Sequence, residues 1–520
     1  MDLLAELTRC NLDPALLTSV RSLLEQADQF SAIIASRDAA IKAAHLKIDA
    51  LTFEVAHHRR IRFAAKSEAF SAEQRTLFEE TWNTDLAAMT AEAEQQAAVL
   101  SPAKPKRARA GRQPLPDHLP RIVHYHEPAS CQCADCGNAL VKIGEDISEQ
   151  LDVEPARFFV HRHIRPQYAC RPCETVTAAP VAPALIDGGM AAVGLLTWVA
   201  ISKYVDHLPL YRIEQIGARQ NVPLSQSTLA EWIGKMGVAL QPLADRLAAW
   251  LRQRPVLHAD ETPVAQLDPG RGKTKRAYLW AYRSNDLEAG PPIVVFDYQP
   301  GRHGHHAASF LQDWRGHLMV DDYGGYKALF NQHVIELACL AHARRKFFEL
   351  NAANGSPIAA QALHRIAALY AIEREGQTMT ADERRQLRQT QAKPLLAAFH
   401  AWLIDVRKTV AKGTKTAKAL DYSLKRWPAL IRYADSGVLP IDNNPVENTI
   451  RPIAIGKKNW LFAGSERAGH RAAAIQSLLA TAKLNGLNPD AWLKDTLEKL
   501  PTWPNNRIDE LLPFPPVSSA

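Results

Sequence analysis

The chain has 520 residues, of which 47% are apolar and 22% charged, and its formal net charge is +7 at pH 7. This length predicts roughly three domains with a buried core, and the mildly basic charge only weakly favours a polyanionic partner. The N-terminus lacks a basic segment followed by a long apolar run, and the most apolar stretch, 191–202, is too short to span a bilayer. The sequence therefore predicts a cytoplasmic protein with no membrane partner.

A seven-residue repeat of apolar residues runs from Val20 to Val55 in a segment free of Gly and Pro. One seam position is occupied by Ala27, Ile34, Ile41, Ile48 and Val55, and the next by Leu23, Phe30, Ala44 and Leu51. β-branched residues at the first position favour a two-stranded parallel coiled coil, and so a homodimer or higher oligomer. An amphipathic helix packed on its own domain is the alternative. Helical character continues to about residue 100, so 1–100 form a predicted leucine-zipper region.

Residues 101–124 are predicted to form a basic, Pro-rich linker, because the prolines at 102, 105, 114, 116 and 120 exclude a helix. Its basic residues are Lys104, Lys106, Arg107, Arg109 and Arg112, with no acidic residue among them. Such a tract can follow DNA phosphates, or it can be a solvated tether. Both interpretations remain open from the sequence.

Five of the seven cysteines lie between 131 and 173, which favours metal binding over a disulfide framework. Two C-x-x-C pairs would supply the four thiolates of a structural Zn²⁺: Cys133, Cys136, Cys170 and Cys173. Redox chemistry is the alternative for a C-x-x-C, but the pairing argues against it. Segments 146–153 and 157–165 have strand patterns, so we place a zinc ribbon-like module at 125–180. Cys131 is a fifth thiol whose role the sequence leaves open.

Residues 181–254 are predicted to be a helical, DNA-binding region. Segments 210–217 and 227–236, separated by a break at 221–223, resemble a helix-turn-helix, and Thr228 with Glu231 could cap the second helix. The second helix offers little Arg or Lys on its exposed face. A helical packing layer is therefore at least as good an interpretation.

Short strand-like runs follow Pro255, at 256–264, 276–284, 292–298, 316–320 and 334–338. A helical block from about 343 to 433 precedes one further helix. This order is typical of an RNase H-like core, here 255–455, with a helical insertion. Residues 456–520 are predicted to be a C-terminal helical region and tail, and the five prolines after residue 500 suggest an extended tail on the surface. The predicted fold class is multidomain α/β.

Three carboxylates stand at the ends of these elements: Asp260 and Asp321 at the ends of apolar runs, and Glu447 at the head of the late helix. They are 61 and then 126 positions apart, so only folding can bring them together. An oxygen-only site suits Mg²⁺ or Mn²⁺, and two such ions about 3.5–4 Å apart catalyse phosphoryl displacement. The pattern predicts a nuclease, polymerase or transposase.

Each carboxylate also has a purely structural interpretation. Asn444 to Glu447 has the pattern of an N-cap followed by Pro at N1 and Glu at N3. Asp260 could simply end a strand, and Asp321 and Asp322 could form an Asx-turn. A helix cap alone would not explain the basic residues that follow Glu447. DNA phosphates would require such residues as hydrogen-bond donors.

Two groups of residues near these carboxylates are predicted to contact DNA. The first opens the helix after the fifth strand: His342, Arg344 and Arg345. The second follows Glu447 within the late helix: Arg451, Lys457, Lys458 and Trp460. Basic side chains in these places could hold the scissile phosphate or orient DNA, and a solvated helix face is the alternative for the first group.

Taken together, the motifs resemble the DDE transposases of the insertion sequence 66 family, over almost the whole chain. The resemblance rests on the zipper and on CADCG…YACRPCE, LHADETPV, VDDYGGY, CLAHARRKF, IDNNPVENTIRPIAIGKKNWLFAGSERAG and NRIDELLPF. It implies a catalytic triad of Asp260, Asp321 and Glu447, and zinc at the two cysteine pairs. Asp322 stands where Gly is commoner in the family, so either Asp321 or Asp322 could bind the metal; we choose Asp321 because it directly ends the strand.

The resemblance implies a transposase that cleaves the ends of its element and transfers the exposed 3′-hydroxyl to target DNA. Its partners would be terminal inverted repeats, target DNA and small accessory proteins of the same element. Two alternatives remain: a catalytically inactive DNA-binding regulator, and an RNase H-like metal-dependent nuclease that cuts without joining. The sequence does not determine the recognised ends, the target preference or whether this copy is active.

Overall fold

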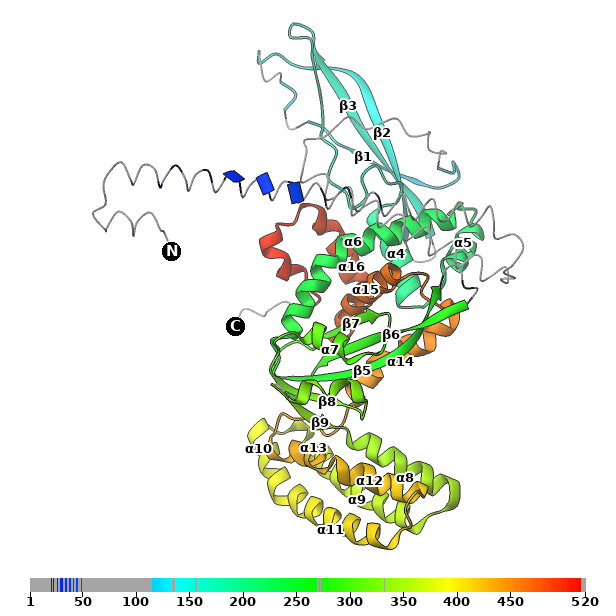
Figure 1. Cartoon of the computed structure of the whole chain (residues 1–520). Coiled ribbons are helices and arrows are strands. Elements are labelled where there is room, and N and C mark those ends of the chain that lie inside the picture. Colours follow the sequence, from blue (N-terminus) through cyan, green and yellow to red (C-terminus); the bar gives the residue numbers. More distant parts are fainter. Residues whose placement is uncertain are drawn as a thin grey trace.

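The structure is a computed structural model that describes residues 115–515, with gaps at 129, 133–135, 155–156, 269–270, 272 and 332, and isolated helical positions between 20 and 48. It contains two β-sheets separated by helices, and a block of helices at the end of the molecule opposite the first sheet (Figure 1). No helix among the described residues is long and apolar enough to cross a membrane.

The first sheet contains β1 (Arg121–Tyr125), β2 (Val141–Glu154), β3 (Arg157–Cys170) and β4 (Thr175–Ala178). β2 and β3 form a long antiparallel hairpin, β1 is parallel to β3, and β4 pairs antiparallel with β3. The hairpin confirms the strands predicted between the two cysteine pairs. β1 begins inside the predicted linker, so the first sheet starts earlier in the chain than predicted.

Three helices follow the first sheet: α4 (Val193–Tyr204), α5 (Leu210–Ala218) and α6 (Gln226–Leu251). The predicted cap of α6 was wrong, because Ser225 is the N-cap and its hydroxyl accepts the N–H of Thr228 at 3.2 Å. Between residues 227 and 236 of α6, only Ser227 is exposed. This burial favours the packing layer over a helix that reads a DNA groove.

The second sheet contains β5 (Val256–Asp268), β6 (Lys273–Ser284), β7 (Val294–Gln299), β8 (Gly316–Val320) and β9 (Val334–Ala338). Its strand order is β7-β6-β5-β8-β9, with β5 to β7 antiparallel and β8 and β9 parallel to β5. This is the RNase H-like arrangement that the sequence predicted. A short helix, α7 (Gly304–Leu311), connects β7 to β8.

Alternate residues of β5 enter two different hydrophobic cores, as the two-residue period of a strand requires. Leu257 and Ala259 belong to the same core as residues of α4 and α6. Val264 belongs to the core that contains residues of α14 (Asn444–Trp460). Asp260 is an even number of residues from Val264, so both side chains lie on the same face of the strand. Its side chain is therefore on the face that α14 covers.

The outer edge of β7, which pairs with no other strand among the described residues, is covered by α15 (Glu466–Leu484). The hydroxyls of Ser477 and Thr481 accept the N–H groups of Phe296 at 2.7 Å and Val294 at 3.1 Å. The same hydroxyls also contact the carbonyls of these two strand residues. Helix α15 thus satisfies the backbone groups that an edge strand would leave unpaired.

The predicted helical insertion is confirmed between β9 and α14, at the end of the molecule opposite the first sheet (Figure 1). Its helices are α8 (Leu340–Asn354), α9 (Pro357–Glu375), α10 (Ala381–Leu387), α11 (Lys393–Thr409), α12 (Lys415–Lys425) and α13 (Trp427–Ile431). Arg388 is fully buried in it, where it pairs with Glu373 and donates to the carbonyls of Tyr433 and Leu439 at 3.1 and 2.9 Å. These bonds fix the path of the chain as it returns to α14.

The C-terminal region continues with α16 (Pro489–Lys499) and two 3₁₀ segments, Leu500–Thr502 and Asn505–Leu511. The prediction of an extended tail was wrong for these residues. Asp509 accepts hydrogen bonds from Arg246 at 2.7 Å and from the indole of Trp250 at 3.2 Å, both on α6. The tail is therefore docked on α6 by specific polar contacts.

Candidate active site and zinc site

The fold brings the three predicted carboxylates together. Asp260 lies in β5, Asp321 directly follows the adjacent parallel strand β8, and Glu447 lies in the first turn of α14. Burial, together with the negative charges of Glu261, Asp321 and Glu447, raises the pKa of Asp260 from 3.8 to about 8. The four carboxylates therefore share one electrostatic site.

Asn443 connects the head of α14 to the strand that carries Asp260. Its amide nitrogen donates to the carbonyl of Ala259 at 2.9 Å, and its amide oxygen accepts from Nδ1 of His258 at 3.0 Å. His258 is buried, and burial lowers its pKa to about 4, so the ring is neutral at pH 7. No local pattern predicts this connection, because the paired positions are far apart in the chain.

The structural alternative for Glu447, a helix cap at Asn444, is not found. The N-cap of α14 is Asn443, one residue earlier than predicted, and no side chain caps this helix. The Oε1 atom of Glu447 lies 3.6 Å from Nδ1 of His342, and its Oε2 atom lies 3.4 Å from a guanidinium nitrogen of Arg345. Glu447 Oε1 and His342 Nδ1 are both buried without a hydrogen-bond partner. Helix capping therefore does not explain the position of this carboxylate.

Asp321 and its neighbour Asp322 have different surroundings. One oxygen of Asp321 accepts the N–H of Tyr323 at 2.8 Å, which is the Asx-turn considered from the sequence. Asp322 is half exposed and pairs with Arg426 at 3.3 Å. Asp321 influences the pKa of Asp260, whereas Asp322 is absent from the groups that do so. The geometry therefore favours Asp321 as the ligand.

The donor set at this site fits a divalent cation. The negative charges of three other carboxylates act on Asp260, and among the described residues Glu447 Oε1 and His342 Nδ1 are buried without hydrogen-bond partners. A hard cation would satisfy these atoms and relieve the repulsion. Cys339 also lies within 4.8 Å of His342 and Glu447. Burial raises its pKa to about 12, so a neutral thiol, a poor ligand for such ions, is expected there.

The raised pKa of Asp260 predicts a pH effect on the stability of the metal-free protein. Between pH 4 and 8 the folded protein holds a proton on Asp260 that the unfolded chain has lost, so the free energy of unfolding falls as pH rises. Asp260→Asn should therefore raise the melting temperature at pH 8 more than at pH 5, measured by thermal unfolding in EDTA.

The matched control for this measurement is Asp322→Asn, which removes a neighbouring carboxylate that is half exposed. Burial also raises the pKa of Glu288 to about 7 and of Asp297 to about 6, but these groups are common to all three proteins. A difference between wild type and Asp260→Asn that stays constant with pH would contradict the prediction.

A fourth carboxylate, Glu261, was missed by the sequence analysis. Its Oε1 accepts from Nε of Arg302 at 2.7 Å, and its Oε2 accepts from the hydroxyl of Tyr326 at 2.7 Å. The guanidinium of Arg302 also lies 3.8 Å from the ring centroid of Tyr323 and remains 41% exposed. Arg302 is thus held beside the acidic site with part of its charge available to solvent.

The structure places the predicted DNA-contacting residues in different environments. His342 and Arg345 contact Glu447, and Arg344 lies over the ring of Phe348. Lys457 donates to the carbonyl of Pro263 at 2.8 Å, so it joins α14 to β5.

Arg451 and Lys458 are exposed on α14, whereas Trp460 lines a cavity described below. The basic linker residues 104–112 lie outside the described residues.

Three of the four predicted zinc ligands form a cluster. The sulfur atoms of Cys136, Cys170 and Cys173 lie within 4.8 Å of one another, and those of Cys136 and Cys170 are 3.5 Å apart. This spacing fits thiolates at about 2.3 Å from one Zn²⁺. Cys133 lies outside the described residues, and Cys131 is exposed and outside the cluster.

Removal of one thiolate should abolish zinc binding by this cluster. Cys170→Ser is expected to reduce the zinc content from about one ion per chain to near zero, because a closed structural site needs four strong ligands. Cys131→Ser is the matched control and should retain the ion. Elemental analysis of the purified proteins measures both. Equal loss in the two variants would assign Cys131 to the site.

An RNase H-like sheet that gathers carboxylates from β5, from the end of β8 and from a late helix is the architecture of the DDE class of transposases and nucleases. The chain matches the model described as "Transposase IS66 family" over residues 188–471. It also matches a "zinc-finger binding domain of transposase IS66" at 130–174 and an "IS66 C-terminal element" at 477–514. The chain therefore belongs to the IS66 family of transposases.

A fourth match, described as "Transposase C of IS166 homeodomain", covers residues 50–123. This leucine-zipper element begins near the end of the predicted heptad seam and includes the predicted basic linker. The zinc-finger match and the cysteine cluster together indicate a zinc ion in the first module.

Three relatives from Sinorhizobium fredii (strain NBRC 101917 / NGR234) are similar over most of their length. The uncharacterized protein y4jD is 40% identical, with 77% of this chain and 81% of the relative covered. The uncharacterized protein y4qI is also 40% identical, with 79% and 78% covered. The uncharacterized protein y4hP is 32% identical, with 91% and 88% covered.

Proposed function

We propose that the protein cleaves DNA at the ends of an insertion sequence and joins the released 3′-end to target DNA, with Asp260, Asp321 and Glu447 as ligands of two divalent ions. The observation that carries the proposal is the position of Glu447, whose charge contributes to the raised pKa of Asp260 and whose carboxylate does not cap its own helix. Two bound Mg²⁺ or Mn²⁺ ions would activate water and stabilise charge on the scissile phosphate.

The residues around the carboxylates would position the DNA backbone. Arg345 is half exposed next to Glu447, and Arg302 is held by Glu261 on the other side of the site. Guanidinium groups that are fixed by hydrogen bonds lose little freedom when they bind a phosphate. His342 would have a different role from Arg345. Its neutral ring can accept or donate one proton near the phosphate.

The exposed face of α14 offers a path for DNA away from the carboxylates. Arg451, Ile455 and Lys458 follow Glu447 at helical spacing, and all three are exposed. Two positive charges on the face that begins at the catalytic acid suit the backbone of a bound strand. Recognition of the ends would fall to the zinc module, the basic linker and adjoining helices.

A dimer would hold two DNA ends together. Among the described positions of the predicted seam, Ile34, Ile41 and Ile48 are helical and 59%, 53% and 56% exposed. Isoleucines exposed at seven-residue spacing are not covered by their own domain. They therefore favour a coiled coil with a second copy over a helix packed within one chain.

A cleavage and strand-transfer assay on labelled ends of the flanking element, with Mg²⁺ or Mn²⁺ and the accessory proteins present, tests this function. Asp321→Asn should abolish both activities, whereas the matched variant Asp322→Asn should retain them. Cleavage without joined product would identify a nuclease. DNA binding with neither activity in the wild type would identify a DNA-binding regulator.

A further inference from the structure

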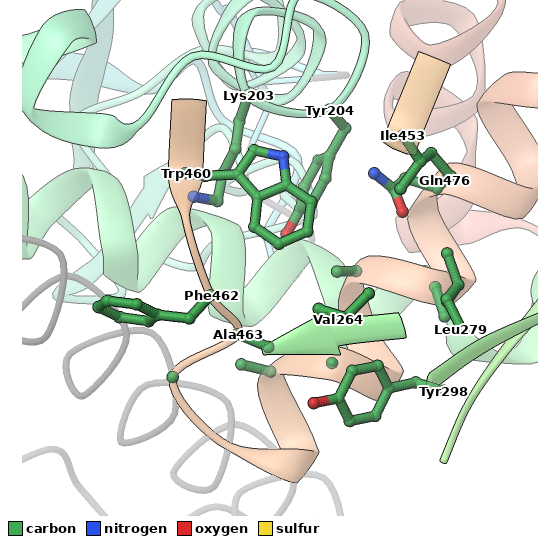
Figure 2. A pocket seen from close by; sticks show the side chains of 15 residues that line it. Lys203, Tyr204, Val264, Leu279, Tyr298, Ile453, Trp460, Phe462, Ala463 and Gln476 are labelled. Carbon is green, nitrogen blue, oxygen red and sulfur yellow. The ribbon is translucent and has the colours of Figure 1, made fainter. Parts of the chain in front are cut away.

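A cavity of about 90 Å³ lies between the second sheet and the C-terminal helices. Figure 2 shows its walls, which come from α4, β5, β6, β7, α14, α15 and the loop between the last two helices. Aromatic rings of Tyr204, Tyr298 and Trp460 line it, together with aliphatic side chains such as Val264. Flat apolar walls of this kind suit a planar ring.

The position of Tyr298 and Trp460 is fixed by the surrounding backbone. Gly469 lets the ring of Tyr298 lie against α15, because any Cβ at this position would collide with that ring. Leu461 follows Trp460 with a φ of +62°, which is rare for a residue with a side chain. Ala463 is then bonded to β5 through the carbonyl of Ala265 at 2.8 Å. The backbone conformation around the cavity therefore fixes the positions of these two rings.

One polar side chain distinguishes this cavity from an ordinary gap in a core. Gln476 on α15 is only 8% exposed, and its side chain lines the cavity. Figure 2 shows this amide directed toward the rings of Trp460 and Tyr204. A glutamine amide offers both hydrogen-bond donors and an acceptor. A ligand with both kinds of group at its edge would match them.

The cavity is connected to the carboxylates by two elements. Val264 is four residues after Asp260 on the same face of β5, which corresponds to about 13 Å along the strand. Glu447 and Trp460 lie at opposite ends of α14. One DNA strand advances about 3.4 Å per nucleotide, so the cavity is about four nucleotides from a phosphate at the carboxylates.

We propose that this cavity receives one unpaired nucleobase of the DNA, stacked against Trp460 and hydrogen-bonded at its edge by Gln476. A base has the planar faces that aromatic walls bind and the donor and acceptor pairs that a glutamine amide reads. The volume admits the inserted edge of the ring, and the sugar and phosphate stay outside. This inference rests on the proposed function, because it names the form of DNA that the site takes.

Binding to a bulged duplex tests the inference without any chemistry. The probe is a short duplex with one bulged 2-aminopurine, compared with the same duplex fully paired, in EDTA. The wild type should bind the bulged duplex about tenfold more tightly and quench the probe. Trp460→Ala and Gln476→Met should bind both duplexes equally, whereas Trp460→Phe should keep most of the preference.

Trp402→Phe, in the helical insertion, is the matched control and should behave as the wild type. Trp460→Phe and Gln476→Met preserve most of the volume, so circular dichroism can verify that these variants fold. Equal affinity of the wild type for both duplexes would overturn the inference. So would a preference that survives both Trp460→Ala and Gln476→Met.

The outcomes for the cavity and for the proposed function are separate, because binding in EDTA requires no cleavage. A wild-type protein that cleaves and joins DNA but does not prefer the bulged duplex would reject only the inference about the cavity. A preference that depends on Trp460, in a protein that never cleaves or joins, would reject the transposase activity and keep the cavity.

Discussion

Glu447→Gln should reduce DNA cleavage by about 10³-fold or more, because a neutral amide cannot replace a charged metal ligand. Glutamine keeps the volume of the side chain, so α14 should still pack on β5 through Val446, Ile450 and Ile453. DNA binding should therefore remain. Single-turnover cleavage with saturating metal measures the chemical step, and a mobility-shift assay measures binding.

Glu375→Gln provides the control for this substitution, because Glu375 is exposed on α9 in the helical insertion. It should leave the cleavage rate unchanged. A Glu447→Gln protein with a tenth or more of the wild-type rate would show that this carboxylate is not a ligand.

Asn443→Ala should reduce cleavage by about 10²-fold, the loss expected when a catalytic group moves by about 1 Å. The substitution removes the bonds to His258 and to the carbonyl of Ala259, which leaves two buried groups without partners. The expected stability loss is about 1–3 kcal/mol. Because Asn443 positions Glu447 relative to Asp260, the Mn²⁺ concentration for half-maximal activity should also rise.

Asn444→Ala is the matched control, since the side-chain amide of Asn444 donates to Asp442 in its own turn at 2.8 Å. It should change the Mn²⁺ requirement little. If Asn443→Ala lowered stability without changing the Mn²⁺ requirement, its role would be purely structural.

The second sheet could be predicted because its strands have strong local patterns. β5 begins as an apolar run that leads into Asp260, β8 is an apolar run that ends directly before Asp321, and helical spacing replaces strand spacing after Leu340. Asn443 and the pairing of Glu261 with Arg302 could not be found in this way. His258 and Asn443 are 185 positions apart, and a hydrogen bond over such a distance leaves no local pattern.

The errors at element ends have a common cause. Two asparagines precede Pro445, and local rules chose Asn444 as the cap. In the folded protein, the hydrogen bonds of Asn443 to β5 make Asn443 the N-cap of the helix. Ser225 was likewise overlooked in favour of Thr228. The prolines of the tail suggested an extended chain, but Asp509 finds Arg246 on α6 and the tail folds against it.

The long helical insertion between Asp321 and Glu447 also affects when the site can exist during synthesis. At about 5–20 residues per second, a ribosome needs about 6–25 s to add the 126 residues that separate these two acids. During that time the nascent chain can form the second sheet and the insertion, but it holds only two of the three acids. A chain released early, before α14 is made, would therefore carry the sheet without the third proposed metal ligand.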